Sequence, residues 1–174
     1  MGLLEPSDMP RILGTKVPAS FYLVTCDPAP LAGMEYPRWE GLSWRALAGL
    51  GLAHVVCLTD EASLYDPSPL PPPVCVQLQD LAGEATPDDP LHEERMVRQA
   101  AADTLAWMRA GEGVVVHCEG GTGRTGTVLG CVLRGLGYTA DEVLAYLDRV
   151  TKARGHEKWP ESDWQADMVR RFVP

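Results

Sequence analysis

The chain has 174 residues, of which 45% are hydrophobic and 22% charged, and its formal net charge at pH 7 is −9. A chain of this length can bury the core of one domain. The excess of acidic residues argues against nucleic acid or an anionic membrane surface as the main partner. We find no run of about 18 apolar residues that would predict a membrane span and no signal-peptide pattern in the first residues.

The five cysteines are the next compositional feature. They form no C-x-x-C pair and show no cysteine or histidine spacing typical of a metal site. An odd number of cysteines without a secretion signal indicates free thiols in a reducing compartment. We therefore expect a soluble, cytoplasmic and monomeric protein.

The N-terminal third predicts an arm, a strand and a helix–strand unit. Residues 1–20 contain three prolines and little periodicity, so we expect an ordered arm or loop. Phe21–Thr25 predicts a first strand, and the prolines that follow it predict a loop with a turn at Leu31–Gly33. The serine that opens 43–50 is a good N-cap for a short helix, and Leu52–Leu58 predicts a buried strand.

The middle of the chain predicts a strand, an acidic loop and a long helix. We expect a short helix over 61–65 and then an extended connection, because several prolines follow. Val74–Leu78 predicts another strand, and an acidic loop over 80–90 comes directly after it. A long helix is expected over about 91–109, with two glycines just beyond it as the stop signal.

Gly113–Gly130 is the stretch around which the rest of the chain is organised. Three valines predict a buried strand that ends at His117 and Cys118, and a glycine-rich loop then leads into an apolar helix that begins near Arg124. The N-terminus of such a helix presents unpaired backbone N–H groups and the positive end of a dipole. Because glycines let successive N–H groups point inward, we expect an anion site here.

The C-terminal third predicts two helices that each begin with a capping box. Thr139 and Glu142 have the spacing of the first box, and Ser162 and Gln165 have that of the second. Strands alternate with helices from the first helix onward, which favours a single α/β domain over 1–174 with a mostly parallel central sheet flanked by helices. The anion site would then lie at the carboxyl edge of that sheet.

Cys118 and Arg124 add chemistry to the expected anion site. Cys118 lies at the base of the loop, where N–H dipoles and a nearby guanidinium should stabilise its thiolate. Arg124 is placed to donate two N–H bonds to one phosphate. A nucleophile below a tetrahedral oxyanion site predicts covalent phosphoryl transfer. The phosphate loop G-x4-G-K-[ST] would need glycine and lysine at these two positions, so that interpretation fails.

The string His117-Cys118-x5-Arg124-Thr125 resembles the signature of the cysteine-dependent protein tyrosine and dual-specificity phosphatases. The interior of the loop is most similar to the kinase-associated phosphatase branch and to compact bacterial relatives. The resemblance implies hydrolysis of phosphomonoesters through a cysteinyl-phosphate intermediate, with no metal or other cofactor. It also implies that the arginine and the loop together hold the phosphate. The loop residues are Glu119, Gly120, Gly121, Thr122 and Gly123.

The general acid of the resembled family is an aspartate on a loop upstream of the nucleophile. Asp80 fits this position because it follows the predicted strand Val74–Leu78. One carboxylate can both protonate the leaving group and later activate water. Asp88, Asp89 and Glu84 are the alternatives, and the first two are also suited to cap the long helix.

The resemblance suggests roles for four further residues. Thr125 takes the place of a family serine or threonine whose hydroxyl assists departure of the sulfur. Gln165 stands where some relatives hold a glutamine, and we interpret it first as a capping residue and second as one that positions water. Cys57 is either a buried strand residue or the counterpart of a cysteine that forms a protective disulfide with the nucleophile. His117 is expected to fix the loop and to point away from the phosphate.

The loop also bears on the substrate. It contains Glu119 and no lysine, which together with the negative net charge argues against polyanionic lipid head groups. We expect a phosphoprotein, phosphorylated on tyrosine or on serine and threonine, or a small phosphomonoester. The alternative is a catalytically weak phosphatase fold that binds phosphorylated partners, because the acid loop matches the family loosely. A thiol-redox or arsenate-reducing enzyme would need a second cysteine near the loop, and Cys131 lies beyond the helix start.

Overall fold

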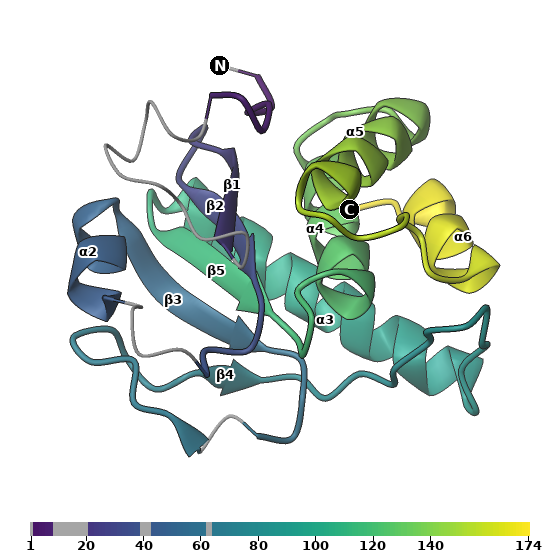
Figure 1. The fold of residues 1–174 in the computed structure, drawn as a ribbon, viewed down its shortest axis with the longest axis horizontal. Helices are drawn as coiled ribbons and strands as arrows, with labels where there is room; N and C mark the ends of the chain where they lie inside the picture. Colours follow the sequence, from purple (N-terminus) through teal and green to yellow (C-terminus); the bar gives the residue numbers. More distant parts are fainter. Residues whose placement is uncertain (1, 9–20, 39–42, 62–63) are drawn as a thin grey trace.

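The computed structural model describes residues 2–8, 21–38, 43–61 and 64–174 (Figure 1). These residues form a five-stranded sheet with helices on both faces. The strands are β1 (Phe21–Thr25), β2 (Leu31–Met34), β3 (Leu52–Cys57), β4 (Val74–Cys75) and β5 (Gly113–His117). The helices are α2 (Trp44–Gly49), α3 (Pro90–Arg109), α4 (Gly123–Gly135), α5 (Ala140–Ala153) and α6 (Asp163–Arg171).

The strands lie in the order β1-β2-β5-β3-β4. β1 and β2 are antiparallel, whereas the other three neighbouring pairs are parallel. This mixed, mostly parallel sheet confirms the predicted α/β class. β5 lies between β2 and β3, so the chain that leaves β5 emerges at the shared carboxyl edge of three parallel strands. Ligands of open α/β sheets bind at this kind of edge.

The helices divide unequally between the two faces of the sheet. α3, α4, α5 and α6 lie on one side and α2 lies on the other (Figure 1). Successive residues of a strand point to opposite faces, and in β5 this alternation serves both layers. Val114 and Val116 pack with α3–α6, while Val115 packs with Leu47 of α2. The strand that leads to Cys118 is therefore fixed by the core on both sides.

The predicted turn at Leu31–Gly33 is wrong. Leu31–Met34 forms β2, which pairs with both β1 and β5. Small residues give this segment a weak strand signal, and its strand conformation depends on two neighbours that are distant in sequence. Gly33 is required in the strand because a Cβ there would collide with the ring of Tyr22.

The predicted strand Val74–Leu78 is shorter in the structure. Only Val74–Cys75 forms β4. The N–H groups of Val76 and Leu78 nevertheless continue the pairing, at 2.9 and 3.1 Å from carbonyl oxygens at and just after the end of β3. The segment therefore runs along β3 as far as the acidic loop. As a result, the acidic loop begins at the carboxyl edge of the sheet.

Two predictions fall partly outside the described residues, namely the arm over 1–20 and the short helix over 61–65. In the described part of the arm, the N–H of Leu4 donates to the carbonyl of Val24 at 2.9 Å, which attaches this segment to β1. No helix in the described ranges is long and apolar enough to cross a membrane.

Most predicted helix caps are confirmed. Ser43 accepts a hydrogen bond from the first turn of α2, and Asp89 caps α3 by accepting from the N–H of His92 at 3.0 Å. Thr139 and Glu142 form the capping box of α5. These polar groups satisfy backbone donors that a helix start leaves without partners.

The second predicted capping box is wrong. Ser162 stands at the N-cap of α6, but its hydroxyl makes no capping bond. The amide oxygen of Gln165 accepts from the N–H of Glu161 at 2.8 Å rather than from that of Ser162. Gln165 is 1% exposed, so the packing of the core around its side chain fixes the orientation of its amide.

Candidate active site

The chain turns sharply between β5 and α4, and Cys118 lies at the base of this turn with 3% of its surface exposed. Gly121 has a φ of 65°, and a Cβ at that position would collide with the backbone of Met34. Glycine alone satisfies both conditions. Because α4 begins at Gly123, its unpaired N–H groups lie at the end of the same loop that begins at Cys118, which suits an anion.

Arg124 and Asp80 meet at the mouth of this loop. Nη2 of Arg124 lies 3.4 Å from Oδ2 of Asp80, and the two side chains are 14% and 60% exposed. Oδ1 of Asp80 also accepts from the N–H of Ala82 at 3.1 Å. An ion pair this exposed contributes at most about 1 kcal/mol, so the carboxylate is positioned near the guanidinium without being locked to it.

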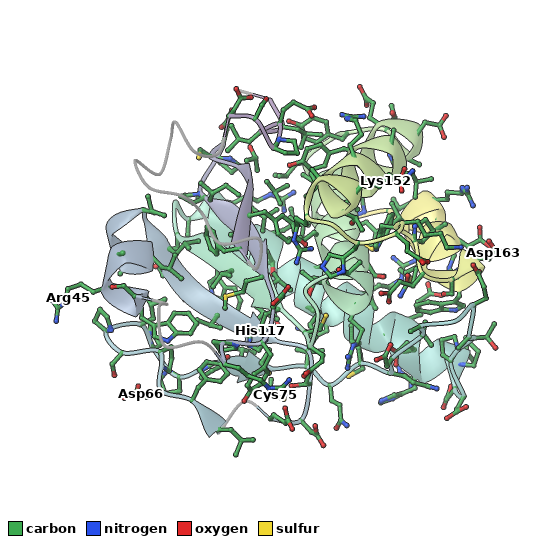
Figure 2. All side chains as sticks on the ribbon, viewed as in Figure 1. Arg45, Asp66, Cys75, His117, Lys152 and Asp163 are labelled. Carbon is green, nitrogen blue, oxygen red and sulfur yellow. The ribbon has the colours of Figure 1, made fainter. Side chains whose placement is uncertain are left out.

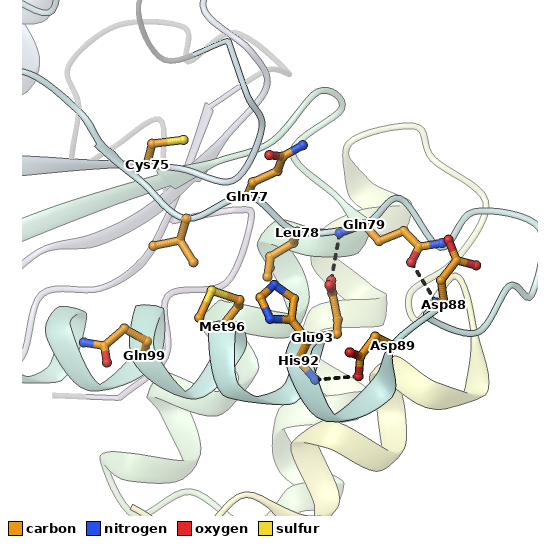
Figure 3. A pocket seen from close by; sticks show the side chains of 11 residues that line it. Cys75, Gln77, Leu78, Gln79, Asp88, Asp89, His92, Glu93, Met96 and Gln99 are labelled. Carbon is orange, nitrogen blue, oxygen red and sulfur yellow. Dashed lines mark hydrogen bonds between the residues drawn. The ribbon is translucent and has the colours of Figure 1, made fainter.

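The other candidate acids have different surroundings. Asp89 caps α3, and the carboxylate of Glu84 forms an ion pair with Lys158. Asp88 lines a groove of about 650 Å³ between segment 75–79 and the first half of α3 (Figure 3). Among the ion pairs of the described residues, none joins these three carboxylates to the arginine of the loop. Of the four candidate acids, Asp80 is the one that forms an ion pair with Arg124 in the described residues.

A second arginine holds the loop from outside. Arg154, whose side chain is 6% exposed, donates to the carbonyl of Gly121 at 2.9 Å and to that of Gly120 at 3.2 Å. Its guanidinium also stacks on the ring of Tyr22, 4.3 Å from the centroid. With their carbonyls held outward, successive N–H groups can face the interior of the loop. Arg154 could not be predicted as a site residue from the sequence, because only the fold brings it to the loop.

His117 contacts the backbone of the nucleophile from the opposite face of the sheet. Nδ1 lies 3.2 Å from the carbonyl oxygen of Cys118, and Nε2 lies 2.6 Å from the hydroxyl of Tyr65. Figure 2 labels His117 among the side chains at this end of the sheet. Burial lowers the pKa of His117 to about 4. The ring is therefore neutral at neutral pH and acts as a fixed hydrogen-bonding group.

Three polar residues complete the loop. The hydroxyl of Thr125 is fully buried and makes no hydrogen bond to the described residues. A buried hydroxyl left unpaired costs about 1–3 kcal/mol, and this one is available to a ligand or to the sulfur. Thr122 donates to the carbonyl of Gly120 at 3.2 Å. The carboxylate of Glu119 turns outward to Arg38, so Glu119 offers the loop only its backbone.

Cys57 lies on the other face of the sheet from Cys118. It pairs in register with His117, and paired residues of parallel strands share a face. Cys118 belongs instead to the core cluster under α3–α6. The sulfur of Cys57 lies 3.6 Å from the carbonyl oxygen of Thr59, and that of Cys75 lies 3.0 Å from the same oxygen. This arrangement favours the buried-strand interpretation over a disulfide with the nucleophile.

A carboxylate that the sequence analysis did not single out lies against the start of α4. A Cβ on Gly123 would collide with Oε2 of Glu161, so this carboxylate packs directly on the glycine. Burial and the charge of Asp80 raise the pKa of Glu161, while Arg124 opposes the shift. A side-chain hydrogen bond with Gln165 also opposes the shift, and Nε2 of Gln165, buried beside Glu161, has no other partner among the described residues. In the sequence, Gly123 indicates that something packs closely on the start of α4, but it does not indicate that this group is the carboxylate of Glu161.

Comparison with known proteins decides the family. Residues 21–162 match the PTP-SAK family model, which is described as "Swiss Army Knife protein, DSP-PTPase phosphatase domain". The chain belongs to this family. It therefore carries a phosphatase domain of the dual-specificity and tyrosine phosphatase type, and the resemblance seen in the signature string is confirmed.

Solved structures of related fold agree with this assignment. A kinase-associated phosphatase is 13% identical, with a TM-score of 0.63 over 90% of this chain and 95% of that one. TpbA from P. aeruginosa is 19% identical, with a TM-score of 0.59 over 90% and 92%. A human tyrosine phosphatase-like serine/threonine/tyrosine-interacting protein is 15% identical, with a TM-score of 0.57 over 82% and 89%. At these identities the likeness establishes the shared fold.

Proposed function

We propose that this protein hydrolyses phosphomonoesters through a cysteinyl phosphate on Cys118. The observation that carries the proposal is the joint placement of Cys118 at the base of the loop and of Arg124 in the first turn of α4. The loop N–H groups and the guanidinium can bind the three non-bridging phosphate oxygens and stabilise the charge of the transition state. A thiolate nucleophile needs no metal for this chemistry.

The first step transfers the phosphoryl group. The thiolate of Cys118 attacks phosphorus, an S–P bond forms, and the P–O bond to the leaving group breaks. Asp80 donates a proton to the departing oxygen, a role supported by its position beside Arg124. Because Asp80 is largely exposed, it can reach leaving groups of different size.

The second step returns the enzyme to its starting state. Water attacks the cysteinyl phosphate, a P–O bond forms as the S–P bond breaks, the electron pair returns to the sulfur, and the proton of the water passes to a carboxylate beside the loop. The buried hydroxyl of Thr125 has no partner among the described residues, and it can donate to the departing thiolate. Inorganic phosphate then leaves the loop.

We further propose that the substrate is a phosphoprotein, with phosphotyrosine and phosphoserine or phosphothreonine both accepted. The loop contains no lysine, and the rim carries the carboxylate of Glu119. Neither feature favours a substrate with several phosphate groups. A protein phosphorylated at one site, or a small phosphomonoester, requires only the single cradle.

The first experiment measures hydrolysis of para-nitrophenyl phosphate in the presence of a metal chelator. We expect turnover by the wild type and none above background by Cys118→Ser. Arg124→Lys should lose at least about 100-fold in kcat/KM, because an ammonium cannot donate two parallel bonds to one phosphate. Full activity of Cys118→Ser would reject the proposal.

A second comparison tests the acid with two matched variants, Asp80→Asn and Asp88→Asn. Asp80→Asn should lower turnover of alkyl phosphates about 100-fold or more, and turnover of activated aryl phosphates much less, because good leaving groups need little protonation. Asp88→Asn should match the wild type on both. The reverse pattern would transfer the role to Asp88.

A phosphate-binding module without turnover is the second candidate. It is supported by the wide exposure of Asp80 and by the similar fold of the human protein named for its interactions. Such a module would bind vanadate with an affinity that depends on Arg124, yet it would release no phosphate from any ester. Turnover by the wild type excludes this function.

A further inference from the structure

Besides Asp80, the charge of Arg124 acts on two further carboxylates, Glu93 and Glu161. Glu93 accepts a hydrogen bond from the N–H of Gln79 at 2.8 Å, whereas Glu161 lies in the turn between α5 and α6. Oε2 of Glu161 packs against Gly123, the first residue of α4, where a Cβ would collide with this oxygen. Glu161 is thus in contact with the phosphate loop itself.

Hydrogen bonds to both the N–H and the carbonyl of Glu161 fix its backbone. Its N–H donates to Oε1 of Gln165 at 2.8 Å, and its carbonyl accepts from the N–H of Glu84 at 3.1 Å. The buried indole of Trp159 lies two residues earlier, with its Nε1 3.4 Å from the carbonyl of Gly123. These contacts tie the backbone of the turn to the start of α4 and keep Glu161 beside the phosphate loop.

Neither helix capping nor ion pairing explains this carboxylate. Within the described residues, no backbone N–H of α4 bonds to Glu161, and no ion pair includes it. A side-chain hydrogen bond with Gln165 lowers the pKa of Glu161 against the larger effect of burial. Nε2 of Gln165, 1% exposed, has no other partner among the described residues. A cavity of about 10 Å³ lies on the other side of this amide, lined by Arg124, Thr127 and Gln165 among others but not by Glu161 or Cys118. That volume holds about one water molecule.

From this placement we propose that Glu161 takes the proton of the water that hydrolyses the cysteinyl phosphate. The inference rests on the proposed function. Water attacks phosphorus, a P–O bond forms as the S–P bond breaks, and the electron pair goes to the sulfur of Cys118. The proton of the water passes to the carboxylate of Glu161 and then to solvent, and Asp80, which lost its proton in the first step, takes one up from solvent. Gln165 is a positioning residue, which holds Glu161 through its oxygen and donates to the water through Nε2.

This assignment divides the two steps between the two carboxylates. Asp80 is 60% exposed and can follow the leaving group, whereas Glu161 is anchored and stays beside the loop after the leaving group has gone. Burial and the charge of Asp80 raise the pKa of Glu161. A carboxylate of higher pKa is the stronger base once it is ionised.

The test separates the two steps by rapid mixing with para-nitrophenyl phosphate. The variants are Glu161→Gln, which keeps the shape and removes the base, and Glu157→Gln, a matched change at an exposed glutamate of the same turn. For Glu161→Gln we expect a burst of about one nitrophenolate per active site at a rate within about twofold of the wild type. The steady-state rate should then fall about 100-fold. Glu157→Gln should follow the wild-type time course.

The outcomes are distinct. A Glu161→Gln enzyme with the wild-type steady-state rate overturns the inference, and so does one in which burst and steady state slow equally, since Glu161 would then act on loop structure or on the first step. Vanadate affinity equal to the wild type confirms that the variant keeps its loop. Failure of the proposed function looks different, because no burst and no turnover would appear in any protein, wild type included, and the inference would fall with it.

Discussion

Arg154 and Tyr22 donate hydrogen bonds to the same atom, the carbonyl oxygen of Gly121, at 2.9 and 2.8 Å. Arg154 is the C-cap residue of α5 and Tyr22 lies in β1, far away in the sequence, and the guanidinium of Arg154 stacks on the ring of Tyr22. Burial raises the pKa of Tyr22 to about 12, with Arg154 opposing the shift, so its hydroxyl remains a donor at neutral pH. The shape of the phosphate loop therefore depends on a contact between the two layers of the fold.

Tyr22→Phe tests this contact with the loss of one oxygen atom. We expect the free energy of unfolding to fall by about 1–2 kcal/mol, because a buried carbonyl loses one donor. Vanadate affinity should fall several-fold in the same protein. The control is Tyr138→Phe, which lies beyond the far end of α4 and should change neither the free energy of unfolding nor the vanadate affinity. Urea titration and vanadate titration provide the two readouts, and an unchanged vanadate affinity in Tyr22→Phe would show that the loop holds its shape without it.

Two glycines of the loop should respond differently to alanine. A Cβ on Gly121 would meet the backbone of Met34 at a positive φ, whereas one on Gly120 would meet nothing within 4 Å. Gly121→Ala should lose roughly 100-fold in kcat/KM, as expected when oxyanion donors are displaced. Gly120→Ala should stay within about threefold of the wild type. Steady-state kinetics on both variants decide the matter, and equal losses would contradict this account of the loop.

The neutral state of His117 predicts a specific dependence of stability on pH. Its pKa is lowered by burial to about 4 in the folded protein, from an ordinary value of 6.5. The stabilisation is therefore complete above pH 6.5 and is lost as pH falls toward 4, because only the unfolded chain takes up the proton. The maximum effect is about 3 kcal/mol. Urea unfolding at several pH values should show a steeper loss for the wild type than for His117→Gln, and parallel curves would refute the assignment.

The separation of Cys57 from Cys118 bears on oxidation. Because Cys57 lies on the opposite face of the sheet, it cannot protect the nucleophile as a disulfide partner. Inactivation by hydrogen peroxide should therefore proceed at the same rate in Cys57→Ser as in the wild type. Recovery of activity after addition of dithiothreitol should also be equal. Faster irreversible inactivation of Cys57→Ser would show that the two sulfurs can meet.

Local patterns in the sequence were enough for the fold class and for the core of the site. The valines of β5, the glycines and the helix start lie within one short stretch, so the strand, loop and helix could be predicted together. The capping box of α5 and the cap of α3 are equally local. Asp80 was predicted from its place after a strand, and the structure puts it beside Arg124.

The remaining features depend on contacts between distant segments. β2 is a strand because it lies between β1 and β5, which Ala32 and Gly33 do not indicate. The sequence predicts Arg154 only as a cation near the end of a helix. In the structure it donates to two carbonyls of the phosphate loop, because the packing of α5 places it beside that loop. Glu161 lies beside Gly123 because the turn before α6 packs against the start of α4. Residues of this kind could not be predicted from spacing, since no local signal distinguishes them from surface charges.

The most direct test of the central claim is the mass of the protein quenched in acid during turnover of a phosphotyrosine peptide. We expect a fraction of the wild type to carry one added phosphoryl group, located on the peptide that contains Cys118, and none on Cys118→Ser. Release of phosphate without a phosphorylated cysteine at any time point would contradict the account. A protein that binds vanadate but neither becomes phosphorylated nor releases phosphate would be a binding module rather than an enzyme.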